Sequence, residues 1–531
     1  MPMNSRAWML SLIVFLAAFA LAFGWQWSFG SYHSEFGGHP DEAGHVVTGL
    51  FIRDALVESW HYAAGGFHGS PIRFGKEFAD RYYTHYPKIG LGVWPPLFYL
   101  VQSAWTLPFG ATRAGLFLLL CGLAALLALL LFRVLREEFG IAQAALTAAV
   151  LISLPLVRTY YGMVMAETLS ALLIFGAIVA FGNFVDREKR RDAIWFGVLA
   201  SAAILTKGTG LALALAAPLA LLFTRRLALL KRPALWGAVL IVTLFAGPWT
   251  WATRNLGRGG WEEPSPSWSF TRGALPYYVD KLAITLGALL GLLFLVGLSV
   301  RIVRGGPRRG LWAAAGSLII AVIIFQSIAP VGKEARHLIP IVPAALMFSL
   351  AGFDFLARRS RGWPKVALVV VVLAGVGWAL FPFKTKGDAG YQPLADKMLA
   401  ESSRDDVALI SSDVIGEGAF IADVALHEQR PGHTIQRASK SLAASTWSGS
   451  GYTPLFTTDE QLFQFLTNGE IRYLIVDDAV PASRRREHHD QIRRVVEQHP
   501  DRFAMIAEAE AWREGVRQQT PVRLYKISAK N

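Results

Sequence analysis

A short stretch, residues 39–45, carries the acidic side chains whose types and position are best suited to acid–base chemistry. Pro40 is followed directly by Asp41 and Glu42, just after the first hydrophobic segment of the chain. Proline suits the first turn of a helix and the helix dipole favours acids there, so the pattern predicts that a helix begins here. That structural interpretation accounts for both acids without any chemistry. The functional interpretation is a general base, Asp41, at the start of the helix.

The same stretch could hold a metal ion. His39, Asp41 and His45 offer the nitrogen and oxygen ligands that zinc binds in proteins. However, the zinc motif HExxH needs a histidine where this chain has Asp41, and the spacing does not require the side chains to converge. A divalent metal therefore stays an alternative, no cofactor is established, and no metal ligand is assigned.

Three further charged residues lie at the edges of apolar segments. Glu167 opens one segment, Lys207 separates two short ones, and Arg336 precedes another. An ionised group at the edge of a membrane is costly, so each is a functional candidate by default. The helix dipole explains the acid in part, and long basic side chains also reach the interface by snorkelling. If they share one side of a membrane, the two cations could bind a lipid phosphate.

The elements that must position these residues are membrane-spanning helices. The chain has 531 residues, is 53% hydrophobic and only 17% charged, and has a mean hydropathy of +0.37, which is too apolar for a soluble protein of this size. The formal net charge of +13 comes mostly from short basic loops between apolar segments. That distribution is typical of membrane topology and not of nucleic-acid binding. The single cysteine, Cys121, lies in an apolar run and excludes an intramolecular disulfide.

The positive-inside rule gives a predicted topology. Basic connectors at 133–136, 187–191, 225–232, 301–309 and 358–365 should face the cytoplasm, which puts Glu167 on the outer side. If 28–92 is also outside, only one crossing fits between residues 92 and 133. The shorter candidate, 93–109, has Pro95 and Pro96 near its start and is predicted to enter the outer leaflet without crossing.

This topology leaves eleven predicted spans and an outer C-terminus. We interpret 7–24 as an uncleaved first span and not as a signal peptide, because Trp25 and Trp27 follow it as an interfacial belt. The spans are 7–24, 112–132, 141–157, 164–184, 193–206, 208–223, 234–252, 282–300, 310–329, 338–356 and 366–383.

From residue 384 onward the composition is that of a soluble domain. Strand-like runs at 407–410, 473–476, 504–507 and 522–527 alternate with helical patterns near 458–468 and 483–498. We therefore predict a transmembrane domain over 1–383, with 28–92 as its first outer loop, and a small extracytoplasmic α/β domain over 384–531. The latter has no Gly-rich phosphate motif, so no catalysis is assigned to it.

Six short motifs occur in order along about residues 1–383, and the set is more specific than any single motif. They are Pro40-Asp41-Glu42-Ala43, Pro95-Pro96-Leu97-Phe98-Tyr99, Ala166-Glu167, Leu205-Thr206-Lys207-Gly208, Pro248-Trp249 and Arg336-His337-Leu338-Ile339-Pro340. This ordered set resembles the polyprenyl-phosphate-sugar-dependent glycosyltransferases of the GT-C fold, in particular the dolichyl-phosphate-mannose protein mannosyltransferases and the aminoarabinose (lipid A) transferases. The sequence departs from the family at Glu167, where many members have Asp, and at His337, which replaces a frequent Tyr.

The resemblance implies a mainly α, polytopic membrane enzyme of the bacterial plasma membrane. It would move a hexosyl or pentosyl group from a polyprenyl phosphate to an acceptor hydroxyl of a lipid, protein or polysaccharide on the non-cytoplasmic face, with inversion. Asp41 is implied as the acid/base and Glu42 as its neighbour in the same motif.

The remaining site residues follow from the same chemistry. Glu167 would be the second carboxylate, while Lys207 and Arg336 would stabilise the departing phosphate. Lys88 lies outside the family's common motifs and is added as a further phosphate ligand by hypothesis. The competing interpretations are a lipid-sugar transporter or flippase, for which the sequence shows no internal repeat, and a membrane scaffold whose outer domain binds a partner.

Overall fold

The computed structural model describes residues 5–66, 69–258, 261, 263, 265–381, 385–386, 390–445, 451–511 and 520–528. The chain forms two compact units that alternate along the sequence. The first comprises Met1–Phe29, Gly92–Phe98 and Phe117–Lys384, and the second comprises Gly30–Leu91, Tyr99–Leu116 and Thr385–Asn531. The region predicted as the first outer loop thus packs in the same unit as the C-terminal domain. The predicted functional division at 383/384 stays a prediction.

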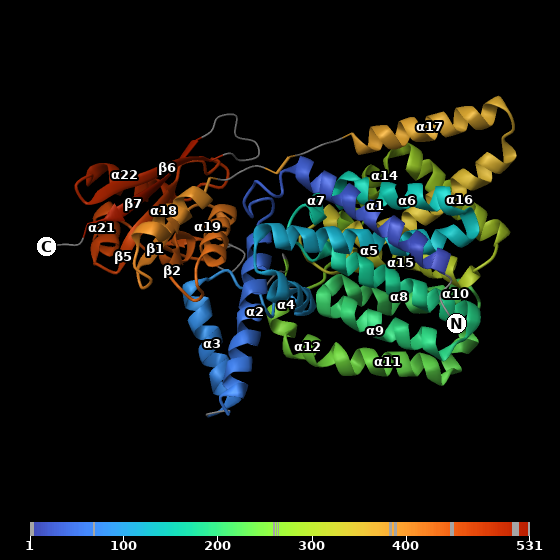
Figure 1. The fold of residues 1–531 in the computed structure, drawn as a ribbon, viewed down its shortest axis with the longest axis horizontal. Coiled ribbons are helices and arrows are strands. Elements are labelled where there is room, and N and C mark those ends of the chain that lie inside the picture. Colours follow the sequence, from blue (N-terminus) through green and yellow to red (C-terminus); the bar gives the residue numbers. More distant parts are fainter. Residues whose placement is uncertain are drawn as a thin grey trace. The chain divides into compact units, whose positions relative to one another are not determined.

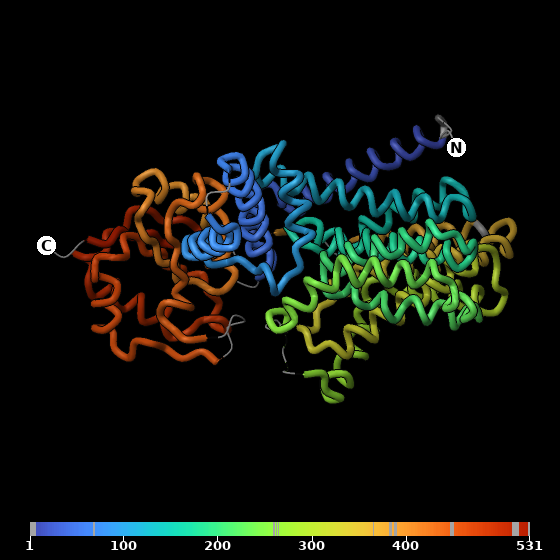
Figure 2. Tube along the Cα trace, turned by 90° about the horizontal axis from the view of Figure 1, so that it is seen from below, coloured from blue at the N-terminus to red at the C-terminus, as the bar shows by residue number. Residues whose placement is uncertain are grey.

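The first unit is helical, and its helices run side by side (Figures 1 and 2). Each of the eleven predicted spans contains a helix, which confirms the mainly α fold class. The elements are α1 (Ser5–Phe29), α5 (Arg113–Phe139), α6 (Ile141–Ser153), α7 (Pro155–Tyr161), α8 (Glu167–Arg187), α9 (Arg190–Thr206), η1 (Gly208–Ala212), α10 (Leu213–Phe223), η2 (Leu227–Lys231), α11 (Pro233–Phe245), α12 (Gly247–Ala252), α13 (Arg254–Gly257), α14 (Trp268–Arg304), α15 (Arg309–Ile328), η4 (Ala335–Ile341), α16 (Val342–Arg359) and α17 (Trp363–Leu380).

Length and composition make the chain an integral membrane protein. Among the described residues, six helices are long and apolar enough to cross a bilayer, or seven if α6 and α7, bent by 63°, form one span. Three shorter apolar helices cover Gly208–Phe223, Pro233–Phe245 and Val366–Leu380. The count of eleven spans therefore stays a prediction. Helix α4 (Leu97–Phe109) has 13 residues and is about 20 Å long, shorter than a hydrocarbon core of about 30 Å. Its predicted entry into the outer leaflet also stays a prediction.

Glycines let the long helices of the first unit approach closely. A Cβ atom at Gly297 of α14 would overlap the carbonyl oxygen of Phe348, and one at Gly352 of α16 would overlap the carbonyl oxygen of Leu293. Small residues serve this purpose at helix contacts in membranes, where packing replaces the hydrophobic effect as the driving force. The two helices are therefore held at backbone-to-backbone distance.

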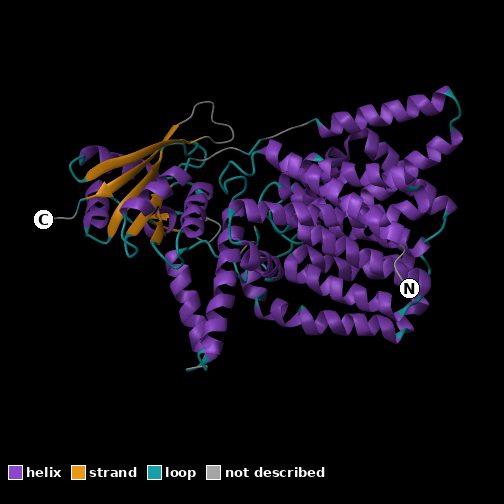
Figure 3. Cartoon of the chain, viewed as in Figure 1, coloured by secondary structure: helices purple, strands orange, loops and turns teal. Residues whose placement is uncertain are grey.

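The C-terminal part of the second unit is the predicted α/β domain, and Figure 3 shows its strands in orange. A five-stranded sheet has the order β2-β1-β5-β7-β6, in which β2, β1 and β5 are parallel and β7 is antiparallel to both of its neighbours, β5 and β6. Buried Leu409, Leu474, Ile492 and Phe503 form part of its core. The elements are α18 (Gln392–Glu401), β1 (Val407–Ser411), α19 (Val414–His427), β2 (Thr434–Arg437), α20 (Ala438–Ser441), β3 (Ala443–Ala444), β4 (Thr453–Pro454), α21 (Asp459–Thr467), β5 (Ile471–Asp477), α22 (Glu487–Gln498), β6 (Phe503–Ala511) and β7 (Thr520–Ile527).

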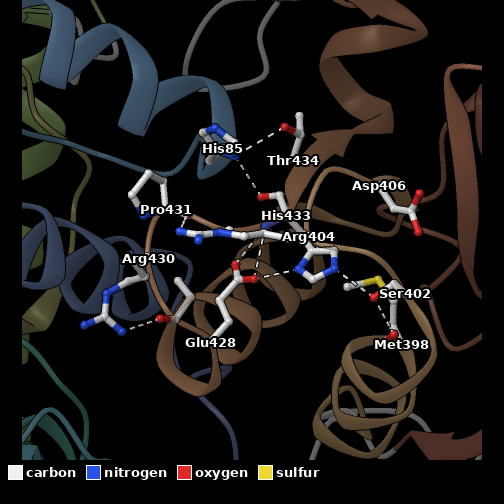
Figure 4. A network of polar contacts seen from close by, with 12 residues as sticks. His85, Met398, Ser402, Arg404, Asp406, Glu428, Arg430, Pro431, His433 and Thr434 are labelled. Atoms are coloured by element: carbon white, nitrogen blue, oxygen red, sulfur yellow. Dashed lines mark hydrogen bonds and ion pairs between the residues drawn. The ribbon is translucent and has the colours of Figure 1, made fainter.

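The first outer region contributes a helical hairpin to this second unit. Helices α2 (Glu42–Ala64) and α3 (Pro71–His85) pack through Phe51 and Phe78, whose ring centroids are 5.4 Å apart. Where α3 ends, the His85 ring lies 3.3 Å from the carbonyl oxygen of His433, in the polar network of Figure 4. The next residue, Tyr86, donates a 2.5 Å hydrogen bond to Glu428. These contacts fasten the hairpin to the C-terminal domain.

Candidate active site

Within the first unit, the structure brings Glu167, Lys207 and Arg336 together. Glu167 is the first residue of α8 and only 2% exposed. Lys207 Nζ lies 2.5 Å from Glu167 Oε1, and an Arg336 terminal nitrogen lies 3.5 Å from the same oxygen. The Arg336 Nε is also 2.8 Å from Glu334 Oε2. These residues, Glu167, Lys207, Glu334 and Arg336, are here called the Glu167 cluster.

Local structure explains why Lys207 reaches this point. It follows the last residue of α9 with an extended backbone, φ −159° and ψ 142°, so the chain leaves the helix there. Gly210 then packs directly on α9, since a Cβ atom at that position would lie 2.6 Å from the backbone nitrogen of Ile204. In addition, Gln326 of α15 donates a 2.8 Å hydrogen bond to the Thr209 hydroxyl. The chain between the two short apolar segments therefore forms a tight, internally packed turn at this lysine.

The Glu167 cluster combines two cations with two carboxylates, so its formal charge is zero. The opposite charges offset the desolvation penalty of burying each ion, and the ion pairs hold the cations in fixed positions. His337, next to Arg336, is 7% exposed, and its ring Nδ1 is 3.1 Å from the Tyr278 hydroxyl. Tyr160 of α7 interacts electrostatically with Arg336 and Glu167. Sequence reasoning missed Tyr160, because nothing in the sequence distinguishes it from an interfacial tyrosine.

In the second unit, the neighbours Asp41 and Glu42 have different surroundings. The structure confirms the predicted helix start, with Asp41 as the N-cap of α2. The Asp41 side chain is 23% exposed, and its Oδ2 is 3.7 Å from His39 Nδ1. The Glu42 side chain is fully buried, and its Oε1 lies 2.5 Å from Lys386 Nζ. Of the two acids, Asp41 is therefore the one whose side chain has exposed surface.

Lys88 belongs to the same unit and interacts electrostatically with Asp41. Its Nζ donates a 3.2 Å hydrogen bond to the carbonyl oxygen of Val414, the first residue of α19. Burial and the nearby Arg437 guanidinium lower the pKa of Lys88 to about 8. A Cβ atom at Gly418 of α19 would lie 2.9 Å from Lys88 Cε and 3.1 Å from Ala43 Cβ. Helix α19, which the sequence analysis missed, thus packs against both the start of α2 and the predicted phosphate ligand.

The histidines beside Asp41 do not form a metal site with it. His45 is 5% exposed, and its Nδ1 lies 2.8 Å from the Tyr99 hydroxyl. In the described part of the chain, no group of three or more His, Cys, Asp or Glu side chains is arranged to hold a metal ion. The functional roles of Asp41, Glu42, Glu167, Lys207, Arg336 and Lys88 stay predictions, while the positions described above are those of the structure.

Comparison with known proteins gives one family and several solved structures. Residues 93–251 match the model of the family described as dolichyl-phosphate-mannose-protein mannosyltransferase. The structure is similar to that of ArnT from Cupriavidus metallidurans bound to undecaprenyl phosphate, with a TM-score of 0.61, 15% identity and 98% of each chain covered. It is also similar to the Archaeoglobus fulgidus oligosaccharyltransferase in the apo form, with a TM-score of 0.55 and 12% identity, over 88% of this chain and 69% of that one. No curated protein is found to match the sequence.

These similarities confirm the resemblance inferred from the motifs, and they give no support for a transporter. The match to the family covers only residues 93–251, whereas the similarity to ArnT covers nearly the whole of both chains. The chain therefore has the GT-C fold of the polyprenyl-phosphate-dependent membrane glycosyltransferases, and its residues 93–251 match their mannosyltransferase family.

Proposed function

We propose that this protein is a membrane glycosyltransferase that moves a hexosyl or pentosyl group from a polyprenyl phosphate to an acceptor hydroxyl. The observation that carries the proposal is the fold shared over 98% of both chains with a protein solved with undecaprenyl phosphate. The buried Glu167 cluster adds cations suited to a phosphate. A lipid, a protein and a polysaccharide are all acceptors of the required chemistry.

The proposed reaction is an in-line displacement at the anomeric carbon of the sugar. A bond forms between the acceptor oxygen and this carbon while the bond to the phosphate oxygen breaks, so the configuration inverts. Asp41 takes the proton of the acceptor hydroxyl. The electron pair leaves with the phosphate, whose charge Lys207, Arg336 and Lys88 stabilise.

Glu167 has a different task from Asp41 in this proposal. Because one of its oxygens faces both Lys207 and Arg336, its carboxylate fixes the distance between the two cations. A site that holds cations in place before the reaction needs no reorganisation when the phosphate charge develops. Glu167 is thus proposed as the group that orients the phosphate ligands.

The proposed location is the non-cytoplasmic face of a bacterial plasma membrane. The basic connectors support it, because the positive-inside rule places them in the cytoplasm and Glu167, Lys207 and Arg336 at outer span ends. With this topology the outer region 28–92 and the domain 384–531 are extracytoplasmic. The steps proposed above use no metal ion, and a divalent metal stays an alternative.

The test uses the purified, full-length protein in lipid nanodiscs with a labelled sugar on undecaprenyl phosphate. Transfer to an added lipid or polysaccharide acceptor, with stoichiometric release of undecaprenyl phosphate, is the expected result. The Asp41→Asn variant, which lacks the proposed general base, serves as the control. In sealed proteoliposomes, movement of the intact sugar lipid across the bilayer without cleavage would instead show a flippase and contradict the proposal.

A further inference from the structure

We infer that Glu42 is a positioning residue that acts through a buried ion pair with Lys386, so that Asp41 alone performs the proton transfer. This inference rests on the proposed function and assigns a role to Lys386. Lys386 lies between α17 and α18 in the sequence, and the ion pair is internal to the second compact unit.

Both oxygens of the Glu42 carboxylate are engaged within the protein. Oε1 lies 2.5 Å from Lys386 Nζ, and neither side chain has any exposed surface. Oε2 accepts a 2.9 Å hydrogen bond from the backbone N–H of Gly38. A carboxylate held in this way cannot approach an acceptor hydroxyl without leaving an uncompensated lysine in the interior.

Next to the ion pair, Lys386 and a second cation, Arg113, both contact the aromatic ring of Phe36. The Phe36 ring has Lys386 Nζ at 5.7 Å from its centroid and the Arg113 guanidinium carbon at 5.3 Å. Arg113 is in turn 3.1 Å from Asp423 of α19, which is fully buried. Contacts of this kind between cations and aromatic faces strengthen when water is excluded. The aromatic ring and its two cations therefore hold the stretch before Asp41 on the C-terminal domain.

Two further contacts join the same segments of chain. The backbone N–H of Gln392 donates a 2.7 Å hydrogen bond to Glu35, which is 2% exposed. Gly30 has a φ of +86°, and a Cβ atom there would lie 3.1 Å from the carbonyl oxygen of Lys386. Gly30, Glu35 and Glu42 thus contact Lys386 or Gln392, and Glu42 is the contact next to Asp41 in the sequence.

The position of Asp41 depends on this attachment. Asp41 is the N-cap and Glu42 the first residue of α2, so any shift of Glu42 moves the Asp41 backbone with it. The Asp41 side chain, at 23% exposure, remains accessible while its neighbour is anchored. The two adjacent acids therefore have different roles: Asp41 faces the substrate, and Glu42 faces the protein interior.

A double-mutant cycle in the full-length protein tests the inference. Removing one partner, with Glu42→Gln or Lys386→Met, should lower kcat by about 10- to 100-fold, because it leaves a buried group without its counter-charge. The double variant Glu42→Gln/Lys386→Met, which removes both charges, should recover to within about 5-fold of wild type. In contrast, if Glu42 carried the reacting proton, the double variant would be as inactive as Glu42→Gln.

Readouts other than rate separate positioning from proton transfer. Each single variant should lower the unfolding temperature and the double variant should restore it, while the pH dependence of kcat/KM keeps its shape. The pair Asp41→Asn/Lys386→Met is the matched control, and it should show no recovery over Asp41→Asn. A double variant that does not fold, or single variants with wild-type kcat and unfolding temperature, would overturn the inference.

Failure of the proposed function would give a different result. In that case wild-type protein would release no undecaprenyl phosphate from any donor. The unfolding temperature would still be lower in each single variant and restored in the double variant. Recovery of stability in the double variant without any transferase activity would therefore support the ion pair and contradict the proposed reaction.

Discussion

Replacing Glu167 by Gln should disable the phosphate ligands while leaving the fold intact. Two unit charges 3.5 Å apart, as for Arg336 and Glu167, interact by about 5 kcal/mol at an effective dielectric constant of about 20. Breaking a buried pair typically costs about 3–5 kcal/mol. Because the Lys207 side chain is 23% exposed, water recovers part of that cost. We expect a net loss of about 2–3 kcal/mol, which corresponds to a rate lower by about 30- to 150-fold if it falls on the transition state.

The assay is the initial rate of undecaprenyl phosphate release from a labelled donor, together with the unfolding temperature of each variant. Glu188→Gln is a matched control, because Glu188 also pairs with two cations, Arg226 and Arg232, but at 29% exposure on the predicted cytoplasmic side. It should change the rate by less than about 3-fold, as exposed pairs contribute little. A Glu167→Gln variant with the same small change would refute the reasoning.

Three other predictions follow from the geometry. Asp41→Asn should lower kcat by at least about 100-fold without changing the unfolding temperature, since a general base contributes about 10²–10⁴-fold, and a rate above a tenth of wild type would contradict its role. Lys88, with its pKa lowered to about 8, is protonated below that pH and neutral above it. The wild-type kcat/KM should therefore fall as the pH rises through about 8, and Lys88→Arg should move this limb to higher pH; an unmoved limb would exclude Lys88. Gly297→Val should abolish the yield of folded protein in detergent, because its Cβ would overlap the Phe348 carbonyl, whereas Gly291→Ala, with nothing within 4 Å, should be tolerated.

The sequence predicted the membrane helices well because their signal is local. A run of about 20 apolar residues is enough to predict a span, whatever other parts of the chain it packs against. The positions of Glu167, Lys207 and Arg336 were predictable for a related reason. Charged residues at the ends of apolar segments stand out in the sequence, and counting the crossings predicts that these three share one face of the membrane. Their convergence on one carboxylate oxygen is a finding of the structure.

Contacts across long distances in the sequence were not predictable. Glu42 looks like an ordinary acid at a helix start, and Lys386 is one of two lysines, with Lys384, that follow the last apolar segment, so neither residue of the pair indicates the other. Helix α19 was missed because it is buried and carries no clear amphipathic pattern, with ten of its 14 residues buried. Of the hairpin of α2 and α3, only the start of α2 was predicted, since the packing partners of the hairpin lie in the C-terminal domain.

The ion pair of Glu42 and Lys386 also sets the order of events during synthesis. Its two members are separated by 344 residues in the sequence, and a second pair, Asp54 and Arg430, is separated by 376 residues. At about 5–20 residues per second, about 20–70 s pass between translation of the acid and of its lysine. During that interval the helix start that carries Asp41 lacks its anchor. We therefore expect transferase activity only after the C-terminal domain has been made, and we predict that a chain truncated before residue 386 is inactive.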